Sequence, residues 1–513
     1  MSFSRRRIGR LAAAIAVAAL VSTACGSGTG SPGPAGDVFR WGYSTPPTSL
    51  DPHRTASAFD LAFLVPIYDT LTLRTASGEL EPNVATAWEF SPDRRNLTLT
   101  LAGGRTFQDG SPIDAAAVKA NVDRAAAPAS SVRNHLKGLT GVHVIDARHV
   151  ALSFNRPAGD IPAVLSNNAG MLVNPAKFGD PGLSTGLPTA GSGVFQVTAS
   201  TATTVSYERW DGHPQAASVA IAGIEMQVQN ADNTRLAAVR SGQLDATFIR
   251  PSQVAEAQAA QLKTVEGTRT QFYGLRLNPG KENLGSPAVR RAMMHAIDRR
   301  TINEHVYDGL CEPTPQPWPS RFFAYDHGLD EEAVGGYDPA LARRLLAEAG
   351  LPGGFHVTLT VTNISAYTRL AEVIQGQLAE IGVEVELKIM DSVQASTAVR
   401  KGSFEMYVGP NESARPGPTS FLSEYFLPGG TSNPGDFDLP GIDAQVDQVR
   451  RTASEEQQAP AIRAAVSEVL AAGPPVVPVC VPATVLAHRD GVRGLEVPLY
   501  GNYDFRRVSK ANH

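Results

Sequence analysis

The sequence predicts an α/β protein with more than one domain, and three observations support this expectation. A chain of 513 residues exceeds the size of a single hydrophobic core, so two or three domains are expected. Residues 85–154 contain short runs of alternating apolar and polar residues separated by turn signals, which is typical of strands. Residues 232–385 alternate between helical and strand patterns, as α/β domains do.

The N-terminus has the pattern of a bacterial export signal, which does not belong to the fold. Four arginines lie within residues 5–10, and residues 11–21 form an apolar core too short to span a bilayer. The ending Thr23-Ala24-Cys25-Gly26 is similar to a lipobox, so lipidation of Cys25 is expected, with plain secretion as the alternative. The arginines are compatible with export by either the Sec or the twin-arginine route, so the sequence does not decide between the two. Residues 26–37 are rich in Gly, Ser and Pro and predict a flexible tether.

Composition narrows the classes of partner and cofactor. Residues 1–24 hold four of the 45 basic residues and none of the 50 acidic ones, so the remaining chain has 41 basic residues and a net charge of −9. An acidic chain is not expected to bind nucleic acid. Beyond Cys25 only Cys311 and Cys480 remain. In an exported protein they form either one disulfide or two separate buried thiols, and with no His or Cys cluster nearby we expect no metal and no cofactor.

Residues 80–121 are the most informative stretch of the chain. Leu97, Leu99 and Leu101 alternate with polar residues, and the preceding turn signal at 91–93 makes this the second strand of a hairpin. Glycines at 103, 104 and 110 predict tight turns. A helix follows, with Asp114 as its N-cap.

Other elements are predicted along the chain. The patterns indicate strands at 39–43, 142–145, 150–154 and 272–278, and helices at 62–73, 232–241, 287–302 and 339–350. Ser192 lies between two glycines, but its spacing differs from the Gly-x-Ser-x-Gly nucleophile elbow and a strand follows it. No catalytic residue is therefore expected.

Several of these stretches resemble one known family. The residues that match are Ala85, Trp88, Glu89, Ser91, Asp93, Gly104, Phe107, Asp109, Gly110, Pro112, Ala115, Val118, Lys119 and Asn121, followed by the runs 241–245, 289–299 and 337–339. This pattern resembles the bacterial extracellular solute-binding protein family 5, the oligopeptide-, dipeptide- and nickel-binding receptors of ABC importers. The resemblance implies a two-lobed periplasmic-binding-protein-like fold (type II, cluster C) with an inserted small third domain.

The resemblance also implies domain bounds. The export signal would cover residues 1–25 and the tether 26–37. Lobe I would be built from 38–82, 185–268 and 482–513, the inserted domain from 83–184, and lobe II from 269–481.

Site residues follow from the positions that line the cleft in that family. The expected ligand-binding residues are Thr55, Ala56, Ser57, Phe248, Ile249, Arg250, Tyr407, Asn411, Glu412 and Arg415. In oligopeptide binders an aspartate holds the ligand's amino terminus, but the matching position here is Ala414. Two further positions also depart from the family: Asn411 stands where a tryptophan is expected, and Val408 where an arginine is expected.

These departures bear on the solute, because a buried ammonium without a counter-charge is heavily penalised. Unless Glu412 takes over by a two-residue shift, a free-amine oligopeptide is disfavoured. Arg415 and Arg250 would then face a carboxylate or another anion. Two alternatives stay open: Glu412 and Arg415 pair with each other, and Arg250 is a solvated loop residue.

The expected function is that of a monomeric receptor, anchored to the outer face of the cytoplasmic membrane by lipid on Cys25. It would close on a small peptide or peptide-like solute and present it to ABC permease subunits. A receptor for a non-peptide anion or a metal chelate is the first alternative. An exported hydrolase and an interaction protein that kept the receptor fold are alternatives from other classes.

Overall fold

The computed structural model describes residues 37–329, 334, 336–452 and 454–511. The predicted export signal, Cys25 and the tether up to residue 36 lie outside the described residues. Within them the α/β class is confirmed, because strands of a large mixed sheet alternate with helices. Among the described helices, none combines the length and the apolar composition that crossing a membrane requires.

One 13-residue strand, β18 (Val476–His488), joins two halves of a 12-stranded sheet. Its first half pairs with β13 (Gln271–Leu277), and its second half pairs with β11 (Ala246–Ile249) and β12 (Lys263–Thr268). Most of the strand is buried, as its run of valines, alanines and prolines predicts for a strand covered on both faces. The strand therefore belongs to both halves at once.

The first half of the sheet extends from β11 through β1, β10, β9 and β8. Strand β1 pairs in parallel with β10 and β11, whereas β10, β9 and β8 form an antiparallel meander. Its elements are β1 (Val38–Tyr43), β8 (Phe195–Ser200), β9 (Thr204–Arg209), β10 (Gly223–Val228), α4 (Asp232–Ser241) and α5 (Val254–Ala259). Two small ladders accompany it, β2 (Thr72–Arg74) with β3 (Leu80–Pro82) and β19 (Val492–Arg493) with β20 (Ser509–Lys510).

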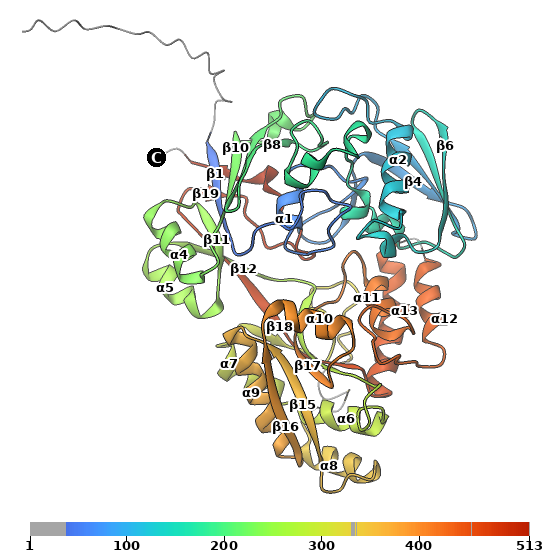
Figure 1. Cartoon of the computed structure of the whole chain (residues 1–513), viewed down its shortest axis with the longest axis vertical. Helices are drawn as coiled ribbons and strands as arrows, with labels where there is room; N and C mark the ends of the chain where they lie inside the picture. The colour runs from blue at the N-terminus through green and yellow to red at the C-terminus, as the bar shows by residue number, and fades with distance from the viewer. Residues whose placement is uncertain (1–36, 330–333, 335, 453, 512–513) are drawn as a thin grey trace, which may run out of the picture. The chain divides into compact units, whose positions relative to one another are not determined.

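The second half extends from β13 through β17 (Met406–Glu412) and β15 (Phe355–Thr362) to β16 (Val383–Met390). Strands β15 and β16 are parallel, so a helical crossover must join them, and α9 (Ser365–Ala379) runs beside both (Figure 1). The other elements here are β14 (Cys311–Pro313), α8 (Pro339–Glu348), α10 (Ser392–Arg400), α11 (Pro418–Phe426), α12 (Ile442–Arg450) and α13 (Glu455–Ala471).

A separate four-stranded sheet contains the hairpin predicted at 85–101. Its order is β4 (Ala85–Phe90), β5 (Asn96–Leu101), β7 (His149–Phe154) and β6 (Leu139–Asp146), and α2 (Ala115–Ala126) packs beside β6 (Figure 1). The alternation of Leu97, Leu99 and Leu101 is confirmed, since all three are fully buried. The Asp114 cap is also confirmed, because its carboxylate accepts from the backbone N–H of Ala117 at 2.9 Å.

The prediction of a helix at 62–73 is wrong beyond the first turn. Helix α1 covers only Leu61–Leu64, and β2 begins at Thr72. Pro66 lacks the amide hydrogen that a continuing helix needs. The carbonyl groups of Pro66 and Ile67 instead accept from the backbone of residues 192–195.

The helix predicted at 287–302 is two helices, α6 (Pro287–His295) and α7 (Arg299–Val306). Asp298 interrupts the run, because its backbone is extended and its carboxylate caps α7 by accepting from the N–H of Thr301 at 3.0 Å. Val289, Met293 and Ile297, spaced four residues apart along this stretch, are nevertheless all fully buried.

Cys311 and Cys480 form a disulfide with an S–S distance of 2.03 Å. The bond joins β14 to β18, and Cys480 lies opposite Tyr273 of β13. Both cysteines are fully buried.

The loop before α3 (Ile161–Val164) packs tightly against the segment between α12 and α13. Gly159 donates its backbone N–H to the carbonyl of Arg450 at 2.8 Å. Nearby, Arg74 forms an ion pair with Glu455 at 2.6 Å. A backbone hydrogen bond and an ion pair therefore join residues that are distant in the sequence.

We expect Gly159→Ala to destabilise the protein. An added Cβ would meet the carbonyl oxygen of Thr452 and lie 2.6 Å from that of Arg450, closer than real Cβ contacts allow. Overpacking of this kind costs about 1–3 kcal/mol of unfolding free energy, measurable by chemical denaturation. Gly179→Ala is the control, since nothing lies within 4 Å of its added Cβ. Equal stability of the two variants would contradict this close packing.

Candidate ligand-binding site

Two arginines meet against the bare Cα of Gly501. Arg269 lies in the short connection between β12 and β13, and Arg415 follows β17. A Cβ added to Gly501 would lie 2.7 Å from Arg415 Nη2 and 3.2 Å from Arg269 Nη1. Gly501 also has a φ of +78°, which side-chain-bearing residues rarely adopt. Both the space and the backbone conformation therefore require glycine at this position.

The two guanidinium groups have few partners within the protein. Arg269 donates to Gln271 Oε1 at 3.3 Å, and Arg415 donates to the carbonyl of Tyr500 at 3.3 Å and lies 3.5 Å from a Glu412 oxygen. Among the described residues, the buried atoms Arg269 Nε, Arg415 Nε and Arg415 Nη1 have no hydrogen-bond partner. Buried donors of cationic groups are costly when unpaired, so this arrangement is suited to an added acidic group.

Glu412 is the nearest counter-charge. Its carboxylate accepts from Gln271 Nε2 at 2.8 Å and pairs loosely with Arg415. Burial would lower the pKa of Arg269, but Tyr503 and Glu412 raise it above its ordinary value. One carboxylate beside two arginines leaves a net positive charge in the site.

Aromatic side chains form the walls around the arginines. The ring of Phe248 lies 5.1 Å from that of Tyr503 and 5.6 Å from that of Tyr43, both in edge-to-face contact. Burial raises the pKa of Tyr43 to about 12 although Arg269 and Arg415 lower it, so its hydroxyl stays neutral. The Tyr503 hydroxyl is buried and has no partner among the described residues.

A second aromatic group comes from the other half of the sheet. The ring of Tyr273 lies 5.5 Å from that of Tyr367 and 5.4 Å from that of Tyr307. Burial raises the pKa of Tyr273, and the positive charge of Arg269 partly offsets this effect.

The segment after α2 contributes His135. Burial, followed by the positive charge of Arg415, lowers the pKa of His135 to about 4. The ring is therefore neutral at pH 7, and its buried Nδ1 has no partner among the described residues.

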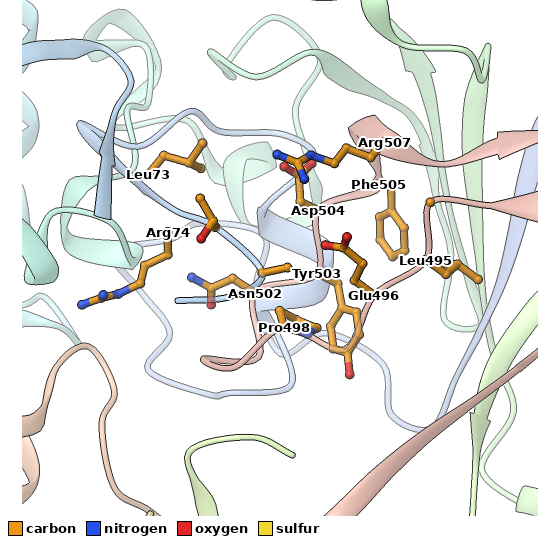
Figure 2. Close-up of a pocket in the computed structure, with 13 residues that line it drawn as sticks. Leu73, Arg74, Leu495, Glu496, Pro498, Asn502, Tyr503, Asp504, Phe505 and Arg507 are labelled. Carbon is orange, nitrogen blue, oxygen red and sulfur yellow. The ribbon is translucent and has the colours of Figure 1, made fainter. Parts of the chain in front are cut away.

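Residues of the loop that carries Gly501, namely Pro498, Asn502 and Tyr503, line a small cavity of about 50 Å³ (Figure 2). Figure 2 shows the Tyr503 ring and the Asp504 carboxylate pointing to opposite sides of this loop. Asp504 forms an ion pair with Arg506 at 2.6 Å, which stabilises the conformation of this loop. A cavity of this size holds water rather than a peptide-sized solute.

The structure brings three of the sequence-predicted residues together, namely Phe248, Glu412 and Arg415. Thr55, Ala56 and Ser57 lie in the loop between β1 and α1. There the Thr55 hydroxyl accepts from the N–H of Ser57 at 3.0 Å. Asp60 ends this loop, and its charge contributes to raising the pKa of Tyr43.

The other predicted residues have different surroundings. Ile249 packs in a separate core cluster with α4 and α5. Arg250 pairs with Asp232 at 2.9 Å and donates to Asn233 at 3.0 Å. The Asn411 amide oxygen accepts from Arg276 at 2.6 Å. Tyr407 is buried, and the centroid of its ring lies 6.0 Å from the same Arg276 guanidinium.

Sequence reasoning missed Arg269, Tyr43, His135 and the loop 499–503. The available signal was the run Leu499-Tyr500-Gly501-Asn502-Tyr503, where a glycine lies between two aromatic residues. Arg269 had no comparable signal, because only the register of β12 and β13 on β18 brings it near Arg415.

Ser192 has no role as a nucleophile in this structure. Its hydroxyl accepts from the N–H of Asp69 at 2.9 Å and donates to the carbonyl of Leu172 at 2.8 Å. Within the described ranges, no three His, Cys, Asp or Glu side chains are grouped to hold a metal ion.

Residues 79–433 match the family model of the bacterial extracellular solute-binding proteins, family 5. The chain belongs to this family. Members are extracytoplasmic receptors of ABC importers for peptides, glutathione or nickel chelates, and they act as binding proteins rather than enzymes.

Relatives and solved structures agree with this assignment. The glutathione-binding proteins GsiB of Salmonella paratyphi A and Escherichia coli O157:H7 are 28% and 29% identical, each match covering 70% of this chain and 70% of the relative. The structure of AgaA from A. tumefaciens R10 with agropinic acid has a TM-score of 0.80 at 23% identity, covering 93% of this chain and 99% of that one. DppA from Helicobacter pylori with the peptide STSA has a TM-score of 0.78 at 20% identity, covering 93% and 98%. The predicted two-lobed fold is confirmed.

Tyr503→Phe should leave the ligand-free protein as stable as the wild type or slightly more stable, because it removes a buried hydroxyl without a partner. Tyr68→Phe is the matched control. The Tyr68 hydroxyl donates to the carbonyl of Leu50 at 2.9 Å, so its loss should cost about 1 kcal/mol of unfolding free energy. Urea denaturation of both variants gives the comparison, and a larger loss in Tyr503→Phe would show that its hydroxyl is bonded within the protein.

Proposed function

We propose that this family 5 protein is a lipid-anchored, monomeric receptor that binds a small acidic peptide or peptide-like solute and delivers it to the permease subunits of an ABC importer. The observation that carries the proposal is the pair of arginines over Gly501: Nε of both residues and Nη1 of Arg415 are buried and lack partners among the described residues. A carboxylate offers two oxygens in the geometry that a guanidinium fork prefers.

The relatives favour a peptide-like solute. The glutathione-binding proteins match most of this chain, and glutathione is a tripeptide with two carboxylates. The Helicobacter pylori neighbour holds the peptide STSA. A terminal carboxylate is common to both solutes and suits the arginine pair.

The chemistry of the site disfavours a solute that depends on a tightly held free amine. Ala414 is fully buried and offers no charge to an ammonium group. Glu412 is the carboxylate nearest to Arg415, and it already accepts from Gln271. An acidic group is therefore the feature that this site selects first.

A metal chelate is the second candidate. The neighbour NikZ from Campylobacter jejuni holds Ni(L-His), and the carboxylates of such a chelate would suit the same arginine donors. The arginine pair recognises an anion in either case, so direct comparison of the solutes must separate the two candidates.

We further propose that the lobes follow the bounds expected from the sequence and close around the solute. Lobe I would comprise 38–82, 185–268 and 482–513, the inserted domain 83–184, and lobe II 269–481. The separate core clusters around Trp41, Leu99 and Phe272 support this division. Arg269 and β18 lie where lobes I and II would join, so closure would move the site walls together.

Arg415→Ala should weaken binding of an acidic solute by roughly tens-fold, because a hydrogen bond to a buried charged group contributes about 1.5–3 kcal/mol. Titration calorimetry with glutathione, dialanine and the nickel–histidine complex measures this and identifies the solute class. Arg240→Ala is the control, since Arg240 is exposed and pairs with Glu256 on the surface. The proposed site would be excluded if both variants bound every probe as the wild type does.

Cys25→Ser tests the anchor, which lies outside the described residues. We expect the wild-type protein to fractionate with membranes of its own host. The serine variant should appear in the soluble exported fraction, because a serine hydroxyl does not accept the lipid that a lipobox cysteine receives. Immunoblots of the two fractions provide the measurement, and an unchanged distribution would refute lipidation.

A further inference from the structure

A cavity of about 310 Å³ lies between residues 134–160 and α11. One wall comes from the segment after α2, and the other comes from α11 and the loop 427–431. This volume is enough for one end of a peptide-sized solute and far exceeds the cavity behind the Gly501 loop.

Some charged residues of the cavity are used to hold its walls together. Asp160 accepts from the Thr419 hydroxyl at 2.7 Å, and Arg450 donates to Ser423 at 2.7 Å and to Asp447 at 3.1 Å. Arg450 Nε also lies 3.7 Å from Asp160. These bonds join the two walls, while the buried Arg450 Nε has no hydrogen-bond partner among the described residues.

Arg156 and Lys137 are differently placed. Arg156 donates to the backbone carbonyl of Lys137 at 2.8 Å, and within the described residues neither side chain forms an ion pair. Burial and then the charge of Arg450 lower the pKa of Arg156, so an added anion would stabilise its charged form. Two carboxylates also line the cavity: Asp160, which accepts from Thr419 and raises the pKa of Arg156, and Glu424, whose own pKa burial raises.

Thr419, which lines this cavity, follows Arg415 by only four residues, and His135 lies on the opposite wall. It lines the cavity, while the positive charge of Arg415 acts on its ring. Its buried Nδ1 has no partner among the described residues, so the neutral ring is able to hydrogen-bond to a solute that passes from one side to the other.

We propose that this cavity is a second anion subsite, in which Arg156 and Lys137 hold an acidic group at the far end of the solute bound at Arg269 and Arg415. The position of the first acidic group rests on the proposed function. The solute class that follows is a short peptide-like molecule with an acidic group at each end and an uncharged middle beside His135.

The test compares probes that differ at one end. Glutathione and N-succinyl-dialanine have two separated carboxylates, whereas N-acetyl-dialanine has one, which the arginine pair takes. Arg156→Gln should weaken binding of the two-ended probes by about tenfold and that of N-acetyl-dialanine by less than about twofold. Arg133→Gln is the matched control, because Arg133 is an exposed arginine of the same segment that does not line the cavity.

Each other outcome has a defined meaning. If Arg156→Gln and Arg133→Gln bind glutathione equally while Arg415→Ala binds it weakly, the second subsite is wrong and the proposed function stands. If Arg415→Ala also binds as the wild type does, both fail. Equal weakening of one-ended and two-ended probes by Arg156→Gln, or failure of the wild type to bind either two-ended probe, would also overturn the inference.

Discussion

Two like charges held together in a buried site are the constraint on which the rest of this structure depends. Arg269 and Arg415 repel each other, and Glu412 compensates only one of them. The fold holds both guanidinium groups against Gly501 by backbone placement, because strands β12, β13 and β17 all end beside the same loop. A site built in this way has more positive than negative charge, and in the proposed function an anionic solute supplies the missing negative charge.

The walls of the site come from distant parts of the chain. Tyr43 and Phe248 lie on strands of the first half of the sheet, Tyr273 lies on the second, and His135 lies beyond α2. No catalytic group is needed to explain this arrangement. Its unpartnered atoms are hydrogen-bond donors and neutral hydroxyls, which bind and orient a solute, whereas Ser192 uses its hydroxyl to join two backbone segments.

The candidate site could be predicted only in part. Phe248, Glu412 and Arg415 were expected from the family resemblance, and the structure groups them. Ile249, one residue further along the strand, faces a different core, because side chains alternate across a strand and the sequence alone does not say which face borders the cleft. Arg269 could not be predicted, because it neighbours Arg415 only through the register of the sheet.

The sequence by itself determined the local structure and the family. Caps, glycine turns and apolar alternation act over a few residues, so the hairpin at 85–101 and the Asp114 cap could be foreseen. Tertiary structure decided where helices stop and which charges meet. Helix α1 ends early because the carbonyl groups of Pro66 and Ile67 bond to residues 192–195, and the arginine pair exists because three separate segments converge on Gly501. Such contacts depend on chain segments far apart in sequence, which no local pattern records.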